Sequence, residues 1–360
     1  MYIDLTDEQR KLQQELRRYF AELMTPELER EVSVGEGGGP LFRSALKKLG
    51  ADGWIGISWP KEYGGQGRST IEQYLFADEA QRAGFPFPFL TISTVGPTIQ
   101  QYGSDEQKRE FLPRILRGEC LFAIGYSEAD AGTDLASLKT RAERDGDDWV
   151  INGQKLWTSL ADHADYIWLA ARTDPNAEKH AGISIFIVDT TQPGFSFTPI
   201  HTLGSIQTNA TYYDNVRVPA TRLVAGEGKG WTLIVNQLNY ERVSLMSAGL
   251  IERLFRETVE LARGTPIAPL LDGWYMLWLT SVLVAQSALF WSADFGRRQQ
   301  VPGRAGRRVP VVSLHCPVVV ADHRAIDVMA RALVSGAEAQ RVGIDELGLA
   351  AGDGRPFGIA

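Results

Sequence analysis

The spacing of hydrophobic residues changes twice along this chain, and these two changes constrain its fold more than any other feature. Up to about residue 118 the apolar residues recur at helical spacing. The first such stretch begins with Thr6 and Gln9 in the spacing of a capping box, followed by apolar residues on one face: Leu12, Leu16, Phe20 and Leu23. From about 119 to 222 short runs rich in β-branched and aromatic residues take over, notably 166–171 and 183–189. A helical pattern returns after that.

This order predicts an α+β fold. We expect an N-terminal helical domain over 1–118, a middle β-barrel-like domain over 119–222 and a C-terminal helical domain that begins over 223–264. Residues 265–360 form an atypical tail.

Turn residues divide these regions further. Residues 59–67, which read Trp-Pro-Lys-Glu-Tyr-Gly-Gly-Gln-Gly, are expected to be a loop. Helices are predicted on either side of it, over 41–49 and from about Thr70. In the middle domain, Trp149-Val-Ile leads into Asn152-Gly153, a dipeptide typical of a tight β-turn.

Composition excludes several classes of protein. A net charge of −7 and a pI near 5.4 argue against a general nucleic-acid binder, which needs a basic surface, and suit a cytoplasmic protein. Two cysteines, Cys120 and Cys316, are too few for a disulfide framework, and no cysteine or histidine spacing predicts a metal site. The acidic N-terminus, 1–9, does not have the pattern of a signal peptide.

One carboxylate stands at a position that the helical pattern assigns to a buried face. In the helix predicted over 231–263, Glu241 shares a face with apolar or small residues: Ile234, Leu238, Leu245 and Gly249. Burial disfavours an ionised carboxylate. The pattern therefore leaves two interpretations open, a buried ion pair and a general base with a raised pKa.

Five segments together resemble the acyl-CoA dehydrogenase family. Residues 239–243, Asn-Tyr-Glu-Arg-Val, lead to Ser-Ala-Gly at 247–249 and are similar to the helix that carries the catalytic glutamate in the isovaleryl-CoA dehydrogenase branch. Residues 124–140 and 151–159 are similar to the family's T/S-E-P-x-A-G-S-D and I-N-G-x-K-x-W-I-T segments. Residues 214–219 and 59–67 resemble D-V-R-V-P and W-P-x-E-Y-G-G-x-G. The segments follow the family's order from residue 3 to about 260.

The resemblance implies an FAD site on the middle domain. The positions that match flavin-binding residues are Ile124, Tyr126, Ser127, Gly132, Thr133, Trp157, Thr158 and Ser159. Glycine at 132 lets the backbone approach the cofactor closely. Thr133 replaces a serine that also contacts the CoA moiety, and it keeps the hydroxyl. On sequence pattern alone, Trp157 would be a sheet-core aromatic; at this spacing the resemblance favours a flavin contact.

The same resemblance implies the reaction and its base. Glu241 would remove the α-proton of an acyl-CoA thioester, while the β-hydrogen leaves as hydride to the flavin. Asn239, Tyr240 and Arg242, together with Thr133, would border the thioester. Electrons would then pass to an electron-transfer flavoprotein.

Three further segments narrow the branch. Residues 165–175, 208–213 and 236–239 look like those of actinobacterial dehydrogenases of sterol side-chain degradation. Those enzymes are heterotetramers in which one chain type carries the base and another completes the flavin site. We therefore expect a sterol side-chain CoA as substrate and a hetero- or homotetramer with a sister chain.

The resemblance ends near Gly264. The R-x-x-F-G and Q-x-x-G-G-x-G segments, which reach FAD across a subunit boundary in the family, are not recognisable in 265–360. Lys229 is the last lysine, and the 21 residues of 273–293 carry no charge. We interpret the tail as the product of a reading frame that is shifted relative to the ancestral gene. A divergent core helix and a membrane anchor at 273–293 are the alternatives.

Two classes of function follow. The first is a working acyl-CoA dehydrogenase subunit, and the second is a non-catalytic or defective subunit that folds its first two domains but does not hold flavin. A flavin monooxygenase on the same fold is disfavoured because such enzymes lack the glutamate that Glu241 supplies. Because the tail lacks the cross-subunit segments, we expect the chain alone to bind FAD weakly.

Overall fold

In the computed structural model the chain divides into two units, 1–278 and 279–360. The structure describes residues 4–33, 37–202, 207–244 and 248–263, all of them in the first unit. The predicted tail, including 273–293, therefore lies outside the described residues. Within the described ranges, no helix is long and apolar enough to cross a membrane.

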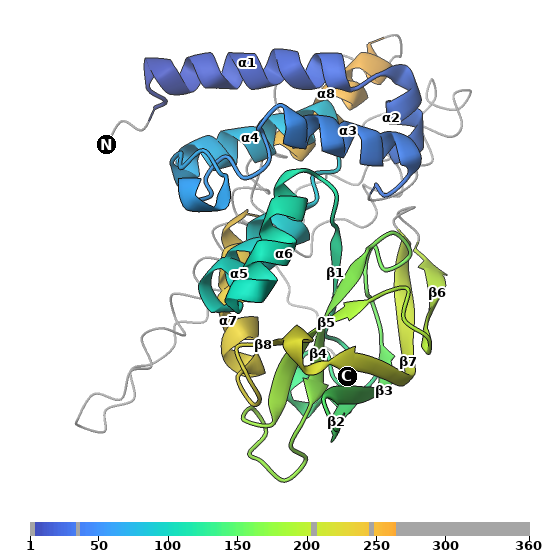
Figure 1. The fold of residues 1–360 in the computed structure, drawn as a ribbon. Helices are drawn as coiled ribbons and strands as arrows, with labels where there is room; N and C mark the ends of the chain where they lie inside the picture. The colour runs from blue at the N-terminus through green and yellow to red at the C-terminus, as the bar shows by residue number, and fades with distance from the viewer. Residues whose placement is uncertain (1–3, 34–36, 203–206, 245–247, 264–360) are drawn as a thin grey trace, which may run out of the picture. The chain divides into compact units, whose positions relative to one another are not determined.

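Helices make up the first part of the chain and return after the strands (Figure 1). The α-helices are α1 (Asp7–Leu23), α2 (Pro26–Val32), α3 (Pro40–Ala51), α4 (Thr70–Ala83), α5 (Gly96–Tyr102), α6 (Asp105–Leu116), α7 (Gly230–Ser244) and α8 (Gly249–Ala262). Four short helical segments lie between them or between strands: η1 (Lys61–Tyr63), η2 (Leu90–Val95), η3 (Leu135–Ser137) and η4 (Ala220–Arg222). Of these, η2 is a π-helix, a rare form that often marks functional sites.

Local sequence explains where the N-terminal helices begin. Thr6 and Gln9 form the predicted capping box of α1, whose buried residues are the four predicted ones: Leu12, Leu16, Phe20 and Leu23. Equivalent boxes open α4, with Ser69 and Glu72, and α6, with Ser104 and Gln107. Each box satisfies two backbone donors that a helix N-terminus leaves free. The predicted loop at 59–67 is a loop except for the single turn of η1.

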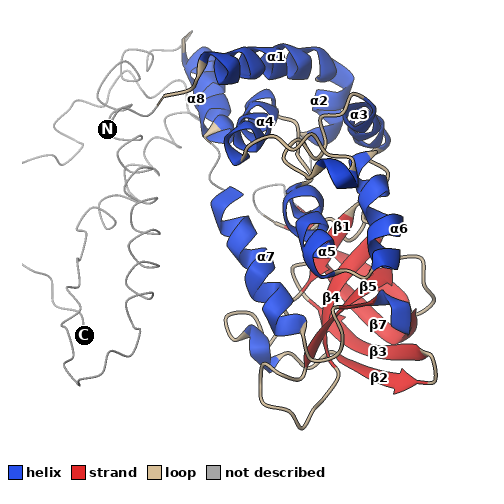
Figure 2. Ribbon diagram, turned by 60° about the vertical axis from the view of Figure 1, so that its left-hand side comes forward, coloured by secondary structure: helices blue, strands red, loops and turns tan. Residues whose placement is uncertain are grey.

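The single helix predicted over 231–263 was wrong, because the structure has two helices there, α7 and α8. The reason lies at the start of α8. The backbone N–H of Gly249 donates to the Asp78 carboxylate of α4 at 2.8 Å, and a Cβ at Gly249 would lie 2.2 Å from the carbonyl oxygen of Asp78. This close approach sets α8 against α4, while α7 packs on η2, α5 and β5 (Figure 2).

The strands of the middle domain form one eight-stranded sheet among the described residues. They are β1 (Phe122–Gly125), β2 (Arg141–Asp145), β3 (Asp148–Lys155), β4 (Tyr166–Arg172), β5 (Ile183–Asp189), β6 (Phe195–His201), β7 (Gln207–Pro219) and β8 (Leu223–Val224). The main order is β6-β7-β3-β2-β4-β5-β8, and β1 pairs with β4. β1–β4 and β2–β4 are parallel, while the other pairs are antiparallel. The predicted helical and sheet regions are confirmed; the domain boundaries stay a prediction.

The apolar run of β4 is explained by burial on both faces of the sheet. Tyr166, Trp168 and Ala170 pack into the core shared with the helices. The alternate residues Ile167, Leu169 and Ala171 pack into a second core inside the sheet domain. Such a strand reads as a continuous hydrophobic run rather than an alternating one.

The turn predicted at Asn152-Gly153 was wrong. Strand β3 runs through both residues, and the turn between β2 and β3 lies instead at Gly146-Asp147, where Gly146 has a φ of +62°. At Gly153 the register with β7 shifts. A Cβ there would lie 2.6 Å from the Thr140 hydroxyl, so the glycine serves a close approach within the sheet rather than a turn.

Candidate active site

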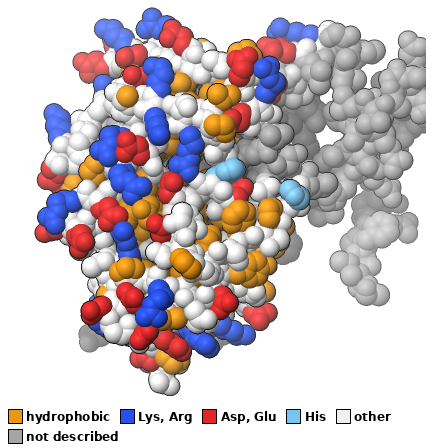
Figure 3. Space-filling model, turned by 45° about the vertical axis from the view of Figure 1, so that its right-hand side comes forward, with side chains coloured by type: hydrophobic (Ala, Val, Ile, Leu, Met, Phe, Trp, Pro, Cys, Tyr) orange, Lys and Arg blue, Asp and Glu red, His pale blue; other side chains and the backbone are white. Residues whose placement is uncertain are grey.

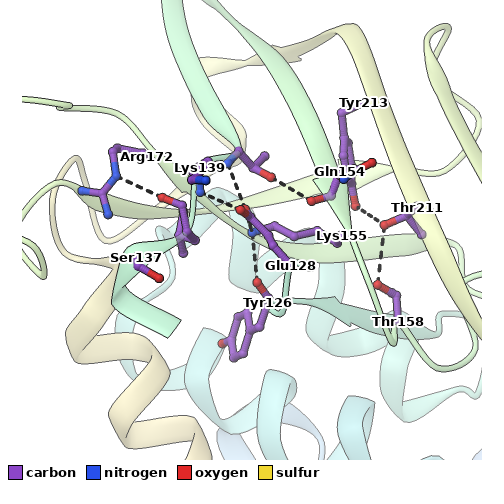
Figure 4. A network of polar contacts seen from close by, with 12 residues as sticks. Tyr126, Glu128, Ser137, Lys139, Gln154, Lys155, Thr158, Arg172, Thr211 and Tyr213 are labelled. Carbon is purple, nitrogen blue, oxygen red and sulfur yellow. Dashed lines mark hydrogen bonds and ion pairs between the residues drawn. The ribbon is translucent and has the colours of Figure 1, made fainter. Parts of the chain in front are cut away.

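A buried ion pair holds the loop that follows β1. The Lys155 side chain is fully buried, and its Nζ lies 2.8 Å from Glu128 Oε1 and 3.0 Å from the carbonyl oxygen of Tyr126 (Figure 4). The Glu128 carboxylate also accepts the backbone N–H groups of Lys139 and Thr140, at 2.7 and 2.9 Å. One carboxylate and one ammonium group therefore tie both ends of this loop to β3.

Burial and pairing act in opposite directions on this ion pair. Burial lowers the pKa of Lys155 to about 8, although the charge of Glu128 opposes the shift. For Glu128, burial alone would raise the pKa, but Lys155 and the two backbone donors outweigh it, so the net pKa is lowered. The pair is thus ionised at neutral pH.

Arg172 fixes the later part of the same loop. Its guanidinium group donates to the carbonyl oxygens of Ala136 and Leu138, at 2.7 and 3.2 Å. Because Arg172 ends β4, the loop is held to the sheet from a second strand (Figure 4).

The segment after β3 places an aromatic ring at the surface. Trp157 has a φ of +65°, a left-handed conformation that a bulky residue adopts at a cost, and its side chain is 58% exposed. The next residue, Thr158, is fully buried, and its backbone N–H donates to the Asn209 carbonyl of β7 at 2.8 Å. The strained backbone therefore turns Trp157 outward on a rigid support. Figure 3 shows that hydrophobic side chains also reach the surface elsewhere, on the face of the molecule drawn there.

The two segments predicted to hold the cofactor lie side by side. The backbone N–H of Leu156 donates to the carbonyl oxygen of Ser127 at 2.8 Å, which joins the loop after β1 to the start of 157–159. Ile124 is half-buried in β1, Ser127 and Ser159 are half-buried, and Gly132 and Thr133 are exposed. A Cβ at Gly132 would meet no heavy atom within 4 Å among the described residues.

These residues fit one side of a flavin. A flat aromatic cofactor needs a stacking surface, and the exposed indole of Trp157 would offer one. Two buried oxygen atoms on β7, Thr208 Oγ1 and Asn209 Oδ1, have no hydrogen-bond partner in the described part of the chain. Buried polar atoms of this kind are rare in proteins and call for a partner, and these two lie on the strand that supports Thr158.

The predicted base lies on α7. Glu241 is half-buried, and burial raises the pKa of its carboxyl group above the ordinary value of 4.5. Among the residues whose side chains the structure describes, no lysine or arginine forms an ion pair with it. Its negative charge reaches Tyr126, whose pKa is raised mainly by burial and further by Glu241. The structure thus brings Glu241 within electrostatic range of Tyr126, at the start of the loop that follows β1.

The other predicted substrate-binding residues lie in different settings. Asn239 and Tyr240 are exposed on α7, as is Thr133 on its loop. Arg242 is part of α7, but its side chain lies outside the described residues.

Sequence reasoning missed two buried polar residues of this site, Lys155 and Gln237. Lys155 follows Trp149 and Ile151 on the inward face of β3, so its parity in the strand indicated burial. Gln237 lies three residues after Ile234 and four before Glu241, which assigns it to the same buried face. Both are fully buried.

Two family models match the parts of the chain described above. Residues 6–119 match the acyl-CoA dehydrogenase N-terminal domain, and residues 123–216 match the acyl-CoA dehydrogenase middle domain. The chain is 56% identical to the acyl-CoA dehydrogenase FadE26 of Mycobacterium tuberculosis (strain ATCC 25618 / H37Rv) over 271 residues, which cover 74% of this chain and 68% of that protein.

Two solved structures share the fold at comparable identity. The Tcur3481-Tcur3483 steroid ACAD matches with a TM-score of 0.71 and 51% identity, over 80% of this chain and 74% of that one. The ChsE4-ChsE5 complex from Mycobacterium tuberculosis matches with a TM-score of 0.71 and 50% identity, over 84% of this chain and 79% of that one. The predicted fold of the helical and sheet regions is confirmed.

Proposed function

Because the chain belongs to the acyl-CoA dehydrogenase family, we propose that it removes two hydrogens from the α and β carbons of an acyl-CoA thioester, as a subunit of an FAD-containing complex. The observation that carries this proposal is the position of Glu241. It is a half-buried carboxylate on α7, with a raised pKa, within electrostatic range of Tyr126, where the loop after β1 begins. A carboxylate in that position can take a proton from a substrate held against the loop.

Burial makes Glu241 a better base. An ordinary carboxylate is a weak base at neutral pH, and a raised pKa brings its proton affinity closer to that of the carbon acid. Taking the α-proton also removes a charge that burial disfavours, so the protonated product is stabilised relative to the starting carboxylate. The loop hydroxyls and backbone amides, Ser127 to Thr133, and the segment Trp157 to Ser159 would hold the cofactor. Bound flavin supplies the acceptor for the β-hydrogen.

We further propose a sterol side-chain CoA as the substrate, a sister acyl-CoA dehydrogenase chain as the partner and an electron-transfer flavoprotein as the electron acceptor. The first two rest on similar structures: one is the Tcur3481-Tcur3483 steroid ACAD, and another is the ChsE4-ChsE5 complex. The sister chain would supply the flavin contacts that the sequence of 265–360 does not offer.

The test compares two glutamate variants of the full chain, expressed alone and with a sister chain. Glu241→Gln is nearly isosteric but cannot accept the proton, so we expect dehydrogenation to fall by at least ~100-fold with folding and flavin content unchanged. Glu227→Gln, an exposed glutamate just before α7, is the charge-matched control and should keep full activity. A panel of acyl-CoAs from short branched chains to steroid side chains would identify the acyl group.

The outcomes separate the two functions. Near-wild-type turnover by Glu241→Gln would contradict its role as the base. Absence of a flavin spectrum in both preparations would favour the defective-subunit alternative instead.

A further inference from the structure

A buried series of hydrogen bonds links the sheet to α7, and among its members only Tyr126 is also a predicted flavin contact. Its members come from four segments: Trp168 of β4, Tyr126 after β1, Gln237 of α7 and Thr94 of η2. Trp168, Gln237 and Thr94 are fully buried, and Tyr126 is 8% exposed. Trp168 Nε1 lies 3.1 Å from the Tyr126 hydroxyl, which contacts Gln237 Oε1; Gln237 Nε2 lies 3.3 Å from Thr94 Oγ1.

The donors and acceptors at the two ends allow only one direction for these hydrogen bonds. The Trp168 indole can only donate, so the Tyr126 oxygen accepts from it and the Tyr126 proton goes to Gln237. At the far end Thr94 donates to the Leu90 carbonyl oxygen at 2.6 Å and must accept from the Gln237 amide. The Gln237 amide therefore has one satisfactory orientation, with its oxygen towards Tyr126 and its nitrogen towards Thr94.

The apolar packing of α7 is concentrated in its first half. Leu233 and Ile234 are buried, Leu238 is half-buried, and Val235 is 44% exposed. Gln237 is thus a main anchor of the helix on its buried side. Rotation of α7 about its axis would break two hydrogen bonds and leave buried polar groups without partners.

Gln237 lies four residues before Glu241, one helical turn away on the same face. Its partner Tyr126 is also close enough to feel the charge of Glu241. We propose that Tyr126 and Gln237 are positioning residues, which hold α7 in the rotation that points Glu241 at the substrate. This proposal rests on the proposed function of Glu241, but its structural part, the fixing of α7, can be tested without catalysis.

The kinetic arm uses Tyr126→Phe, which keeps the ring and removes the hydroxyl, in the full chain within its flavin-containing complex. We expect kcat to fall about tenfold with KM changed less than about twofold, because binding surfaces remain and only the base is misplaced. Introduced into Glu241→Gln, the same substitution should cause no further loss, because the group it positions is gone. An unchanged kcat, or losses that multiply in the double variant, would overturn the positioning role.

The structural arm measures hydrogen exchange over 230–244. Tyr126→Phe and Gln237→Met should each speed exchange in α7 by tenfold or more, and a neighbouring control, Asn236→Met, should not. Asn236 donates an exposed hydrogen bond to Gln101, at 2.9 Å, and takes no part in the buried series of hydrogen bonds. Unchanged exchange in both test variants would overturn the inference. If the wild-type complex dehydrogenates no acyl-CoA of the panel, the proposed function fails. The hydrogen-exchange measurement then still decides whether the buried hydrogen bonds fix the position of α7.

Discussion

The Nζ atom of Lys155 lies 3.0 Å from the backbone carbonyl oxygen of Tyr126, while the hydroxyl of the same tyrosine contacts Gln237 on α7. Tyr126 therefore belongs to two networks at once. Through its backbone it joins the ion pair that holds the predicted flavin loop, and through its side chain it joins the helix that carries Glu241. The loop and the base are thus connected through one residue.

The first prediction concerns the buried member of the ion pair. Lys155→Met would leave the Glu128 charge buried without its cation, so we expect the free energy of unfolding to fall by about 3–5 kcal/mol. Lys139→Met is the matched control, because Lys139 pairs with Asp130 at the surface with both side chains more than 70% exposed. Urea denaturation should show no measurable change for the control. Equal effects of the two substitutions would contradict the importance of burial.

The second prediction concerns pH. The pKa of Glu128 in the folded protein is lower than the ordinary value of 4.5. Between the lowered pKa and 4.5, the unfolded chain therefore binds more protons than the folded one. The stabilisation from this carboxylate is therefore fully present above pH 4.5 and is lost as pH falls through the lowered pKa. Glu128→Gln does not titrate. The difference in urea midpoint between wild type and this variant should be largest at neutral pH and should become smaller at acidic pH. A difference that does not depend on pH would contradict the lowered pKa of Glu128.

Much of this architecture could be predicted from the sequence because its signals are local. The capping box at Thr6 and Gln9 and the strand over 183–189 depend only on neighbouring residues, and both are confirmed. The two errors have a shared physical cause. Gly153 and Gly249 are each required by the close approach of a distant segment, near Thr140 and Asp78, and the local pattern at a glycine does not reveal which segment approaches.

In the candidate site, too, local sequence predicts some features and distant contacts decide the others. The position of Glu241 on a buried helix face follows from helical spacing, and the structure has it half-buried there. The partners of Lys155 and Gln237 could not be predicted, because each is held by residues far away in the sequence, at Glu128 and Tyr126. The parity of a strand or helix indicates that a polar residue is buried, but not what satisfies it.

The third prediction concerns the start of α8. Ala248 provides no side-chain cap, and the Asp78 carboxylate of α4 accepts the Gly249 N–H instead. Gly249→Ala would place a methyl group 2.2 Å from the Asp78 carbonyl oxygen, so the helices must separate, at a cost of about 1–3 kcal/mol. Gly132→Ala is the control for stability, since no heavy atom of the described residues lies within 4 Å of the added carbon. Equal melting temperatures for the two variants would contradict the tight α4–α8 contact.

The last prediction concerns Trp157, where strain and exposure occur together. A left-handed backbone costs an L-residue about 1–2 kcal/mol, and glycine adopts it freely but loses more entropy on folding. Because the indole is 58% exposed, its removal gives up little packing. Trp157→Gly should therefore leave the free energy of unfolding within about 1 kcal/mol of wild type.

Flavin binding should respond differently. If the indole stacks on the cofactor, its loss should weaken FAD affinity by roughly tenfold or more, since each ~1.4 kcal/mol of contact is a factor of ten. Fluorescence titration of FAD into deflavinated complex measures this, with Phe197→Ala of β6 as the exposed aromatic control. An unchanged FAD affinity would exclude stacking on Trp157. A large loss of stability in Trp157→Gly would instead show that the indole supports the fold. It would contradict the prediction that Trp157 matters for cofactor binding and not for stability.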